Sequence, residues 1–111
     1  MSLQLMRQAT RASALLACLL IGACASGARD RAQLAERAED FDRAVAEYTR
    51  ALQERPDDPS LRRDLERAKL RAAQQHYAEG RRHAGLGNYD EALVEYQIAA
   101  EMNPLSGEIQ D

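Results

Sequence analysis

The 111-residue chain contains no tryptophan, one phenylalanine and only two cysteines. With so few large apolar side chains it can bury only a modest core. Its three prolines and six glycines leave long stretches without a helix breaker. Basic residues are not in excess either, because the chain has 15 basic and 18 acidic residues. A nucleic-acid-binding surface is normally basic, so this balance argues against a nucleic-acid partner.

The N-terminus has the order of a secretory signal. Arg7 and Arg11 precede an uncharged stretch over 12–28 that is rich in alanine and leucine, and mixed charged sequence follows. The apolar core of this signal, about 12–23, is shorter than the roughly 20 residues that a membrane-spanning helix needs. Cleavage would leave 13 basic residues against 18 acidic ones and no free thiol able to form a disulfide within one chain.

The residues Leu20-Ile21-Gly22-Ala23-Cys24 resemble a bacterial lipobox. The resemblance implies that Cys24 is lipidated and becomes the mature N-terminus, and Ala25 in place of aspartate implies sorting to the outer membrane. Cys18 also follows apolar residues and an alanine, but it lies too close to Arg11 for a full apolar core. The alternative is an ordinary signal or an uncleaved anchor, with Cys24 as a bystander.

One pattern occurs twice in the chain. We call residues 41–56 (FDRAVAEYTRALQERP) copy one and residues 89–104 (YDEALVEYQIAAEMNP) copy two. Six of their sixteen paired positions are identical. In both copies aromatic and apolar residues recur at i, i+4, i+7 and i+11 beside paired alanines, the period of one helix face. A repeat at a fixed period is typical of proteins that expose an interaction surface.

The periodicity and breakers predict an all-α fold with helices over 28–38, 40–54, 59–85 and 88–102. Asp58 is placed to cap the long third helix, with Pro59 at its first position. Asn88 and Glu91 form a capping-box-like pair at the start of the last helix. Leu61, Leu65, Ala68 and Ala72 in the first half of the long helix are expected to pack against copy one.

The stretch GLGNYDEALVEYQIAAEMNP over 85–104 resembles the second half of a tetratricopeptide repeat. Gly80 falls where that family has a small residue in the preceding helix, and Ala32 takes this place before copy one, where Glu39-Asp40 replaces the glycine turn. The family implies about two helix-turn-helix repeats, here joined by a long connecting helix. Two features depart from the family: His76 stands where a large aromatic is expected, and the spacing from Phe41 to Tyr89 is longer than the family's repeat.

No catalytic or metal site is expected. His76 and His83 are seven residues apart on one helix, which places their backbones roughly 10 Å apart, too far to chelate one ion without a third ligand. The carboxylates are interleaved with arginines in i,i+3 spacing, as in Asp64 and Arg67, which is typical of a solvated helix face. We therefore expect no enzyme activity, no cofactor and no metal.

The resemblance places peptide contacts on the first helix of each repeat. The corresponding positions before copy two include Gln74, Tyr77 and Arg81. Tyr77 could anchor a partner through its ring, and Arg81 could pair with a carboxylate. The alternative is that Tyr77 belongs to the core and Arg81 is merely solvated. Copy two lacks a following helix in residues 1–111, so its apolar stripe is expected to be uncovered. The protein would then self-associate, bind a partner, or be the front end of a longer protein.

The layout also resembles the N-terminal region of outer-membrane secretins of type II secretion and type IV pilus systems, over residues 62–104. We expect a signal over 1–23, a lipidated N-terminus and short linker over 24–30, a helical repeat domain over 31–106, and a tail or the start of a further helix over 107–111. The resemblance implies a non-enzymatic scaffold, lipid-anchored in the cell envelope and facing the periplasm from the outer membrane. Its partner would be a protein of a secretin-type export complex. The alternatives are a free-standing pilotin-like lipoprotein and a docking regulator of a cell-wall enzyme.

Overall fold

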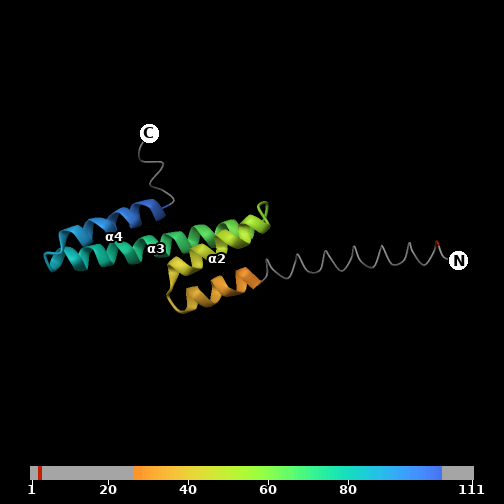
Figure 1. Ribbon diagram of the computed structural model, residues 1–111, viewed down its shortest axis with the longest axis horizontal. Helices are drawn as coiled ribbons and strands as arrows, with labels where there is room; N and C mark the ends of the chain where they lie inside the picture. Colours follow the sequence, from red (N-terminus) through yellow and green to blue (C-terminus); the bar gives the residue numbers. More distant parts are fainter. Residues whose placement is uncertain (1–2, 4–26, 104–111) are drawn as a thin grey trace, which may run out of the picture.

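The computed structural model describes residue 3 and residues 27–103, and these residues are helical with no strand. A helix over 27–37 is followed by α2 (Phe41–Glu54), α3 (Pro59–Gly85) and α4 (Tyr89–Met102). The long α3 contacts both of the other labelled helices: α2 packs along its first half and α4 along its second half (Figure 1). The all-α prediction and the four helical segments are confirmed, with ends that differ by one residue.

The start of α3 is fixed by a side-chain cap. The Asp58 carboxylate accepts hydrogen bonds from the backbone N–H groups of Ser60 and Leu61, and Pro59 occupies the first turn. The predicted capping pair at α4 is wrong, because the Asn88 side chain makes no cap hydrogen bond. There the backbone holds the turn instead: the Asn88 N–H donates to the His83 carbonyl at 2.9 Å.

The two turns that precede α2 and α4 have the same backbone contact. The Asp40 N–H donates to the Ala35 carbonyl at 2.9 Å, and this bond occupies the same place before copy one as the Asn88 bond does before copy two. Gly87 has a φ of 79° in this turn, and Glu39 holds the corresponding position with a φ of 58°. A side chain at positive φ is strained, so copy one keeps the glycine turn geometry without the glycine.

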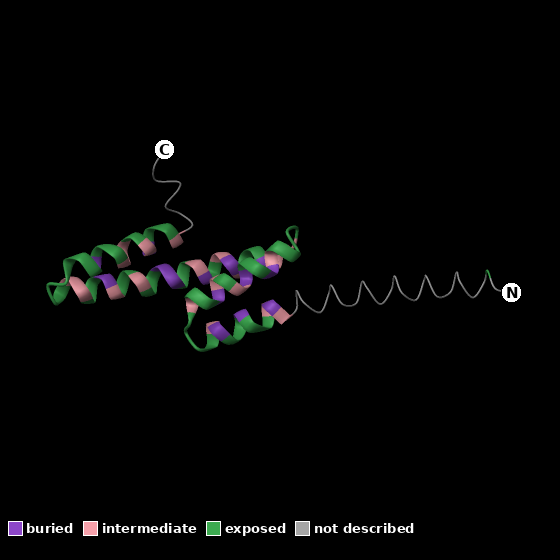
Figure 2. Ribbon diagram, viewed as in Figure 1, coloured by how far each residue is buried: buried purple, intermediate pink, exposed green. Residues whose placement is uncertain are grey.

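The main core lies where the helix over 27–37, α2 and the first half of α3 meet (Figure 2). Tyr48 and Leu61 are its largest fully buried side chains. Small residues surround them, which allows the three helices to approach closely; the core residues are Ala28, Ala32, Ala35, Ala44, Tyr48, Ala51, Leu61, Leu65 and Ala68. The predicted packing of the start of α3 against copy one is confirmed for Leu61, Leu65 and Ala68, whereas Ala72 is buried outside this cluster. The first helix begins at residue 27, so it includes residues 27–30 of the expected linker over 24–30, and Ala28 is fully buried. Residues 24–26 lie outside the described residues.

The second half of α3 and α4 pair through smaller contacts. Ala73 and Gly80 on α3 and Ala92 and Ala99 on α4 are buried, but no third helix of the described residues covers this pair. Tyr89, at the start of α4, is 72% exposed. None of the helices over 27–103 is long and apolar enough to cross a bilayer.

Candidate functional site

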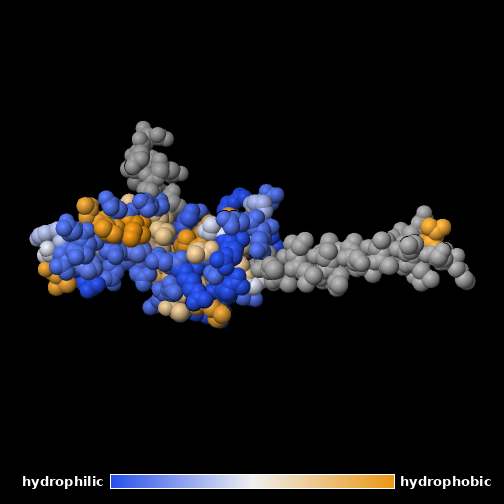
Figure 3. Space-filling view, viewed as in Figure 1, coloured by the Kyte–Doolittle hydropathy of each residue, from blue (hydrophilic) through white to orange (hydrophobic). Residues whose placement is uncertain are grey.

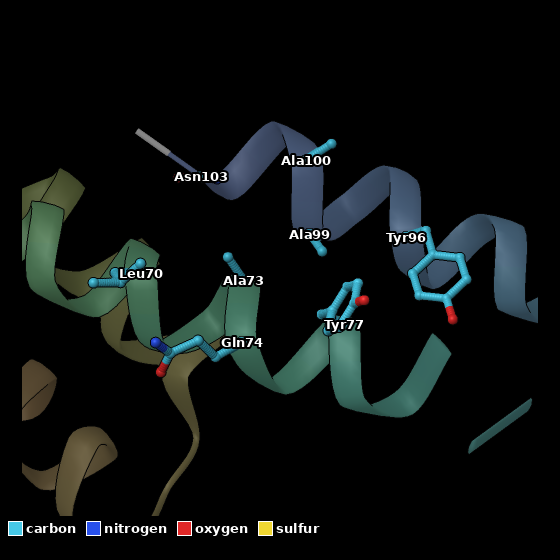
Figure 4. Close-up of a pocket in the computed structure, with 8 residues that line it drawn as sticks. All are labelled: Leu70, Ala73, Gln74, Tyr77, Tyr96, Ala99, Ala100 and Asn103. Atoms are coloured by element: carbon cyan, nitrogen blue, oxygen red, sulfur yellow. The ribbon is translucent and has the colours of Figure 1, made fainter. Parts of the chain in front are cut away.

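An open apolar groove of about 630 Å³ lies between α3 and α4. The groove is lined by Leu70, Ala73, Gln74, Tyr77, Tyr96, Ala99, Ala100 and Asn103 (Figure 4). Apolar side chains gather over α4 on the face shown in Figure 3. The amides of Gln74 and Asn103 and the hydroxyls of the two tyrosines supply polar atoms in an otherwise apolar lining.

Two tyrosine rings stand in this groove, one from each helix. The ring centroids of Tyr77 and Tyr96 are 5.4 Å apart and the rings are tilted by 48°. This spacing lies in the range that favours aromatic pairs. Tyr77 is 55% exposed, so it is not part of a closed core. Its exposed ring and its hydroxyl have the amphipathic character that is common in residues that anchor protein partners.

Gly80 lets the Tyr96 ring approach the backbone of α3. A Cβ atom placed on Gly80 would lie 2.7 Å from two ring carbons of Tyr96, which is closer than nonbonded carbon atoms approach. The ring therefore lies against the helix at the position where α3 has no side chain. Gly80 thus sets the depth of the groove through the position of Tyr96.

The corresponding surface of copy one is covered. Tyr48, the counterpart of Tyr96, is fully buried, because Leu61 and Leu65 of α3 belong to the same core cluster. Arg29, the counterpart of Tyr77, donates hydrogen bonds to Ser60 and Asp64 of the same covering helix, each at 2.8 Å. In the described residues no segment covers the corresponding surface of copy two. The groove therefore corresponds to the surface of copy one that the first half of α3 covers.

Two of the three predicted contact residues lie together in the groove. Gln74 and Tyr77 line it, one helical turn apart on α3. Arg81 is exposed one turn further along but does not line the groove. Cys24, the predicted lipidation site, lies outside the described residues.

The α4 wall of the groove belongs to the apolar stripe of copy two that the sequence predicts to be uncovered. Tyr96 and Ala100 of that stripe line the groove, together with the adjacent Ala99. Their counterparts in copy one are Tyr48, Leu52 and Ala51, which lie in or against the core that α3 covers. Leu70, which extends the groove along α3, was not predicted.

A second cluster surrounds His76, in a cavity of about 570 Å³. The His76 Nδ1 atom lies 2.6 Å from Glu95 of α4, and its Nε2 atom lies 3.0 Å from both carboxylate oxygens of Asp42 of α2. Partial burial by itself lowers the pKa of His76, but the hydrogen bonds to the two carboxylates and their charges outweigh it and raise the pKa above its ordinary value. The cluster shares no lining residue with the groove.

An ion-pair network ties the start of α3 to the helix over 27–37. Asp64, whose side chain is only 13% exposed, pairs with Arg29 at 2.8 Å and with Arg67 at 2.9 Å. Arg67 also pairs with Glu36 of the first helix at 2.9 Å. Asp64 and Arg67 therefore do not form the simple solvated face that their spacing predicts, because their contacts reach across helices.

The described residues offer little catalytic chemistry. Residues 27–103 contain no group of three or more histidine, cysteine, aspartate or glutamate side chains placed to hold a metal ion. The lining of the groove contains no carboxylate, histidine, lysine or arginine. Its arrangement suits the burial of an apolar surface and a few hydrogen bonds, which is the chemistry of protein binding.

Comparison with known proteins yields no match: no protein-family model, no curated protein and no solved structure is similar to this chain at a significant level.

Proposed function

We propose that this chain is a non-enzymatic interaction scaffold of the tetratricopeptide type. One observation carries the proposal: the groove between α3 and α4 is open at the place where α3 covers the corresponding surface of copy one. Three features support the repeat relationship: the paired alanines of the two copies, the equivalent tyrosines Tyr48 and Tyr96, and the shared turn geometry around Glu39 and Gly87. The partner is a protein segment that buries an apolar face in the groove.

The proposed setting is the bacterial envelope. The signal-like N-terminus and the lipobox-like residues before Cys24 support a lipid anchor at the outer membrane. The sequence resemblance to secretins favours a partner from an export complex. A pilotin-like lipoprotein and a regulator of a cell-wall enzyme would use the same groove, so the identity of the partner distinguishes the three.

Affinity purification tests the scaffold role. The full chain with a C-terminal tag is expressed with its own signal, solubilised from the envelope in detergent, and its partners are identified by mass spectrometry. Leu70→Glu places a charge in the groove at a residue that is 42% exposed. Leu86→Glu is the matched control, because Leu86 is 66% exposed and lies outside the groove lining.

The groove variant should lose the partner while the control retains it, with equal helical circular dichroism for both. Recovery of secretin subunits supports the export role, and recovery of a peptidoglycan enzyme supports the regulator instead. Equal recovery by both variants contradicts the groove as the binding site. Recovery of the bait alone indicates self-association and contradicts the export role. Cys24→Ser should release the chain from the membrane fraction, and unchanged fractionation contradicts the lipid anchor.

A further inference from the structure

The His76 cluster joins three helices through one side chain. His76 lies near the middle of α3, Asp42 lies in the first turn of α2, and Glu95 lies in the middle of α4. The imidazole stands between the two carboxylates, with a different ring nitrogen facing each of them. Its side chain is only 15% exposed, so solvent screens these contacts less than it screens a surface pair.

This geometry requires a doubly protonated ring. An ionised carboxylate only accepts hydrogen bonds, and a neutral imidazole carries a proton on one nitrogen only. The 2.6 Å contact with Glu95 and the 3.0 Å contact with Asp42 are therefore both hydrogen bonds only when His76 is an imidazolium. In the neutral ring, one nitrogen lone pair faces a carboxylate and that contact becomes repulsive.

When the ring loses one proton, the contact with Asp42 should break before the contact with Glu95. It is longer than the contact with Glu95, and the Asp42 side chain is 53% exposed against 25% for Glu95. Water can hydrate the Asp42 carboxylate once it leaves the ring. Glu95 has less access to water, so its carboxylate keeps the hydrogen bond from the N–H that the ring still carries.

We propose that His76 is a protonation-dependent clasp that joins α2 to α4 across α3, and that loss of one ring proton releases the first turn of α2. The raised pKa sets the direction of the change. The clasp is complete below the ordinary histidine pKa of about 6.5, and it opens as the pH rises through the raised value. The cluster and the groove share no lining residue, and the clasp is argued without the proposed partner.

Other charged and titratable groups face the same cavity. The turn before α2 contributes two carboxylates, and α3 contributes one carboxylate, one arginine and a second histidine: Glu39, Asp40, Glu79, Arg82 and His83. Arg82 pairs with Glu79 at 2.6 Å, which offsets one of the negative charges. The remaining carboxylates on the turn add to the negative field that favours the imidazolium. His83 provides an internal control for the carboxylate contacts of His76, because its own Nδ1 atom is buried without a hydrogen-bond partner.

Nuclear magnetic resonance on the full chain in detergent tests the clasp directly. The ring nitrogens of both histidines are titrated in the wild type, in Asp42→Asn and in Glu95→Gln. His76 should keep its second ring proton to a higher pH than an ordinary histidine, and each substitution should lower its pKa. A wild-type His76 that titrates at or below the ordinary value, or that ignores both substitutions, overturns the proposal.

Backbone hydrogen exchange supplies the structural readout. Amides over 44–46, corrected for the intrinsic effect of pH, should be several-fold less protected at about pH 8.5 than at about pH 6. His76→Gln should abolish this pH difference, while the control His83→Gln should keep it. If His76→Gln fails to fold, Asp42→Asn serves as the second variant, because it changes an exposed residue and should also abolish the difference. Protection that does not change with pH in the wild type contradicts the release of α2.

Discussion

The ring of Tyr96 lies against the backbone of Gly80, at a distance that leaves no room for a methyl group. A Cβ atom on Gly80 would stand 2.7 Å from the Cδ1 and Cε1 atoms of the ring. This contact joins α3 to α4 and also places the ring in the groove beside Tyr77. The stability of the second helical pair and the shape of the groove therefore depend on the same glycine.

Gly80→Ala should destabilise the protein by about 1–2 kcal/mol. The added methyl group displaces the Tyr96 ring, and overpacking of this kind outweighs the gain in helix propensity of about 0.5–1 kcal/mol. Gly85→Ala is the matched control, because nothing lies within 4 Å of a Cβ atom at that helical position. It should be neutral or slightly stabilising. Urea denaturation followed by circular dichroism measures both, and equal stabilities would contradict the close contact.

The two equivalent tyrosines should differ in their contribution to stability. Tyr48→Ala removes a fully buried ring from the main core and should cost about 3–5 kcal/mol. Tyr96→Ala removes a ring that is only partly buried and should cost less than half as much. The same denaturation experiment compares them. A larger loss for Tyr96 would show that copy two is covered in solution.

The helix caps provide a second matched pair. Asp58→Ala removes two hydrogen bonds to the first turn of α3 and should cost about 1 kcal/mol. Asn88→Ala removes a side chain that makes no cap hydrogen bond, so it should cost no more than a few tenths of a kcal/mol. Thermal denaturation distinguishes the two. A similar loss for both would mean that Asn88 caps α4 in solution.

Glu39→Gly should stabilise the protein by about 0.5–1 kcal/mol. Glu39 has a φ of 58°, where a side chain is strained and glycine is not. Part of the gain is offset by the greater freedom of glycine in the unfolded chain. Glu39→Ala is the control: it keeps the Cβ atom and should leave the stability close to that of the wild type. A gain from alanine equal to that from glycine would contradict the strain.

Glu36 should make the stability depend on acid pH. Partial burial alone raises the pKa of Glu36, but hydrogen bonds with Arg67 and Tyr48 outweigh it and lower the pKa below its ordinary value of 4.5. The stabilisation is complete above that ordinary value and is lost as the pH falls through the lowered pKa. Glu36→Gln should therefore lose less stability than the wild type between about pH 5 and pH 2. The control Glu66→Gln, at a surface pair with Lys69, should retain the wild-type acid dependence.

The helices could be predicted because their signals are local. Pro59 and Asp58 mark the start of α3, and the apolar stripe of copy one marks the face that α2 buries. Local patterns failed at Asn88, where a backbone hydrogen bond from the turn replaces the expected side-chain cap. They also do not predict the burial of Ala28, because it depends on helices that follow later in the chain.

The site could be predicted only in part. The family resemblance pointed to Gln74 and Tyr77 on α3, and the predicted uncovered stripe included Ala100 on α4, but only the packing of the two helices brings these residues into one groove. The role of His76 was missed for a similar reason. Its carboxylate partners are Asp42, far before it in the chain, and Glu95, well after it, and only the packing of α2 and α4 on α3 brings them together.

The sequence by itself determined the all-α class, the helix boundaries and the pattern that occurs at 41–56 and again at 89–104, because propensities, caps and breakers act between near neighbours. Only the tertiary structure decided how deeply each copy is buried and which charges meet. Tyr48 and Tyr96 occupy the same place in that pattern, yet one is fully buried and the other lines an open groove. The physical reason is that burial and ion pairing depend on the helix that packs alongside, and that neighbour is specified by the whole fold.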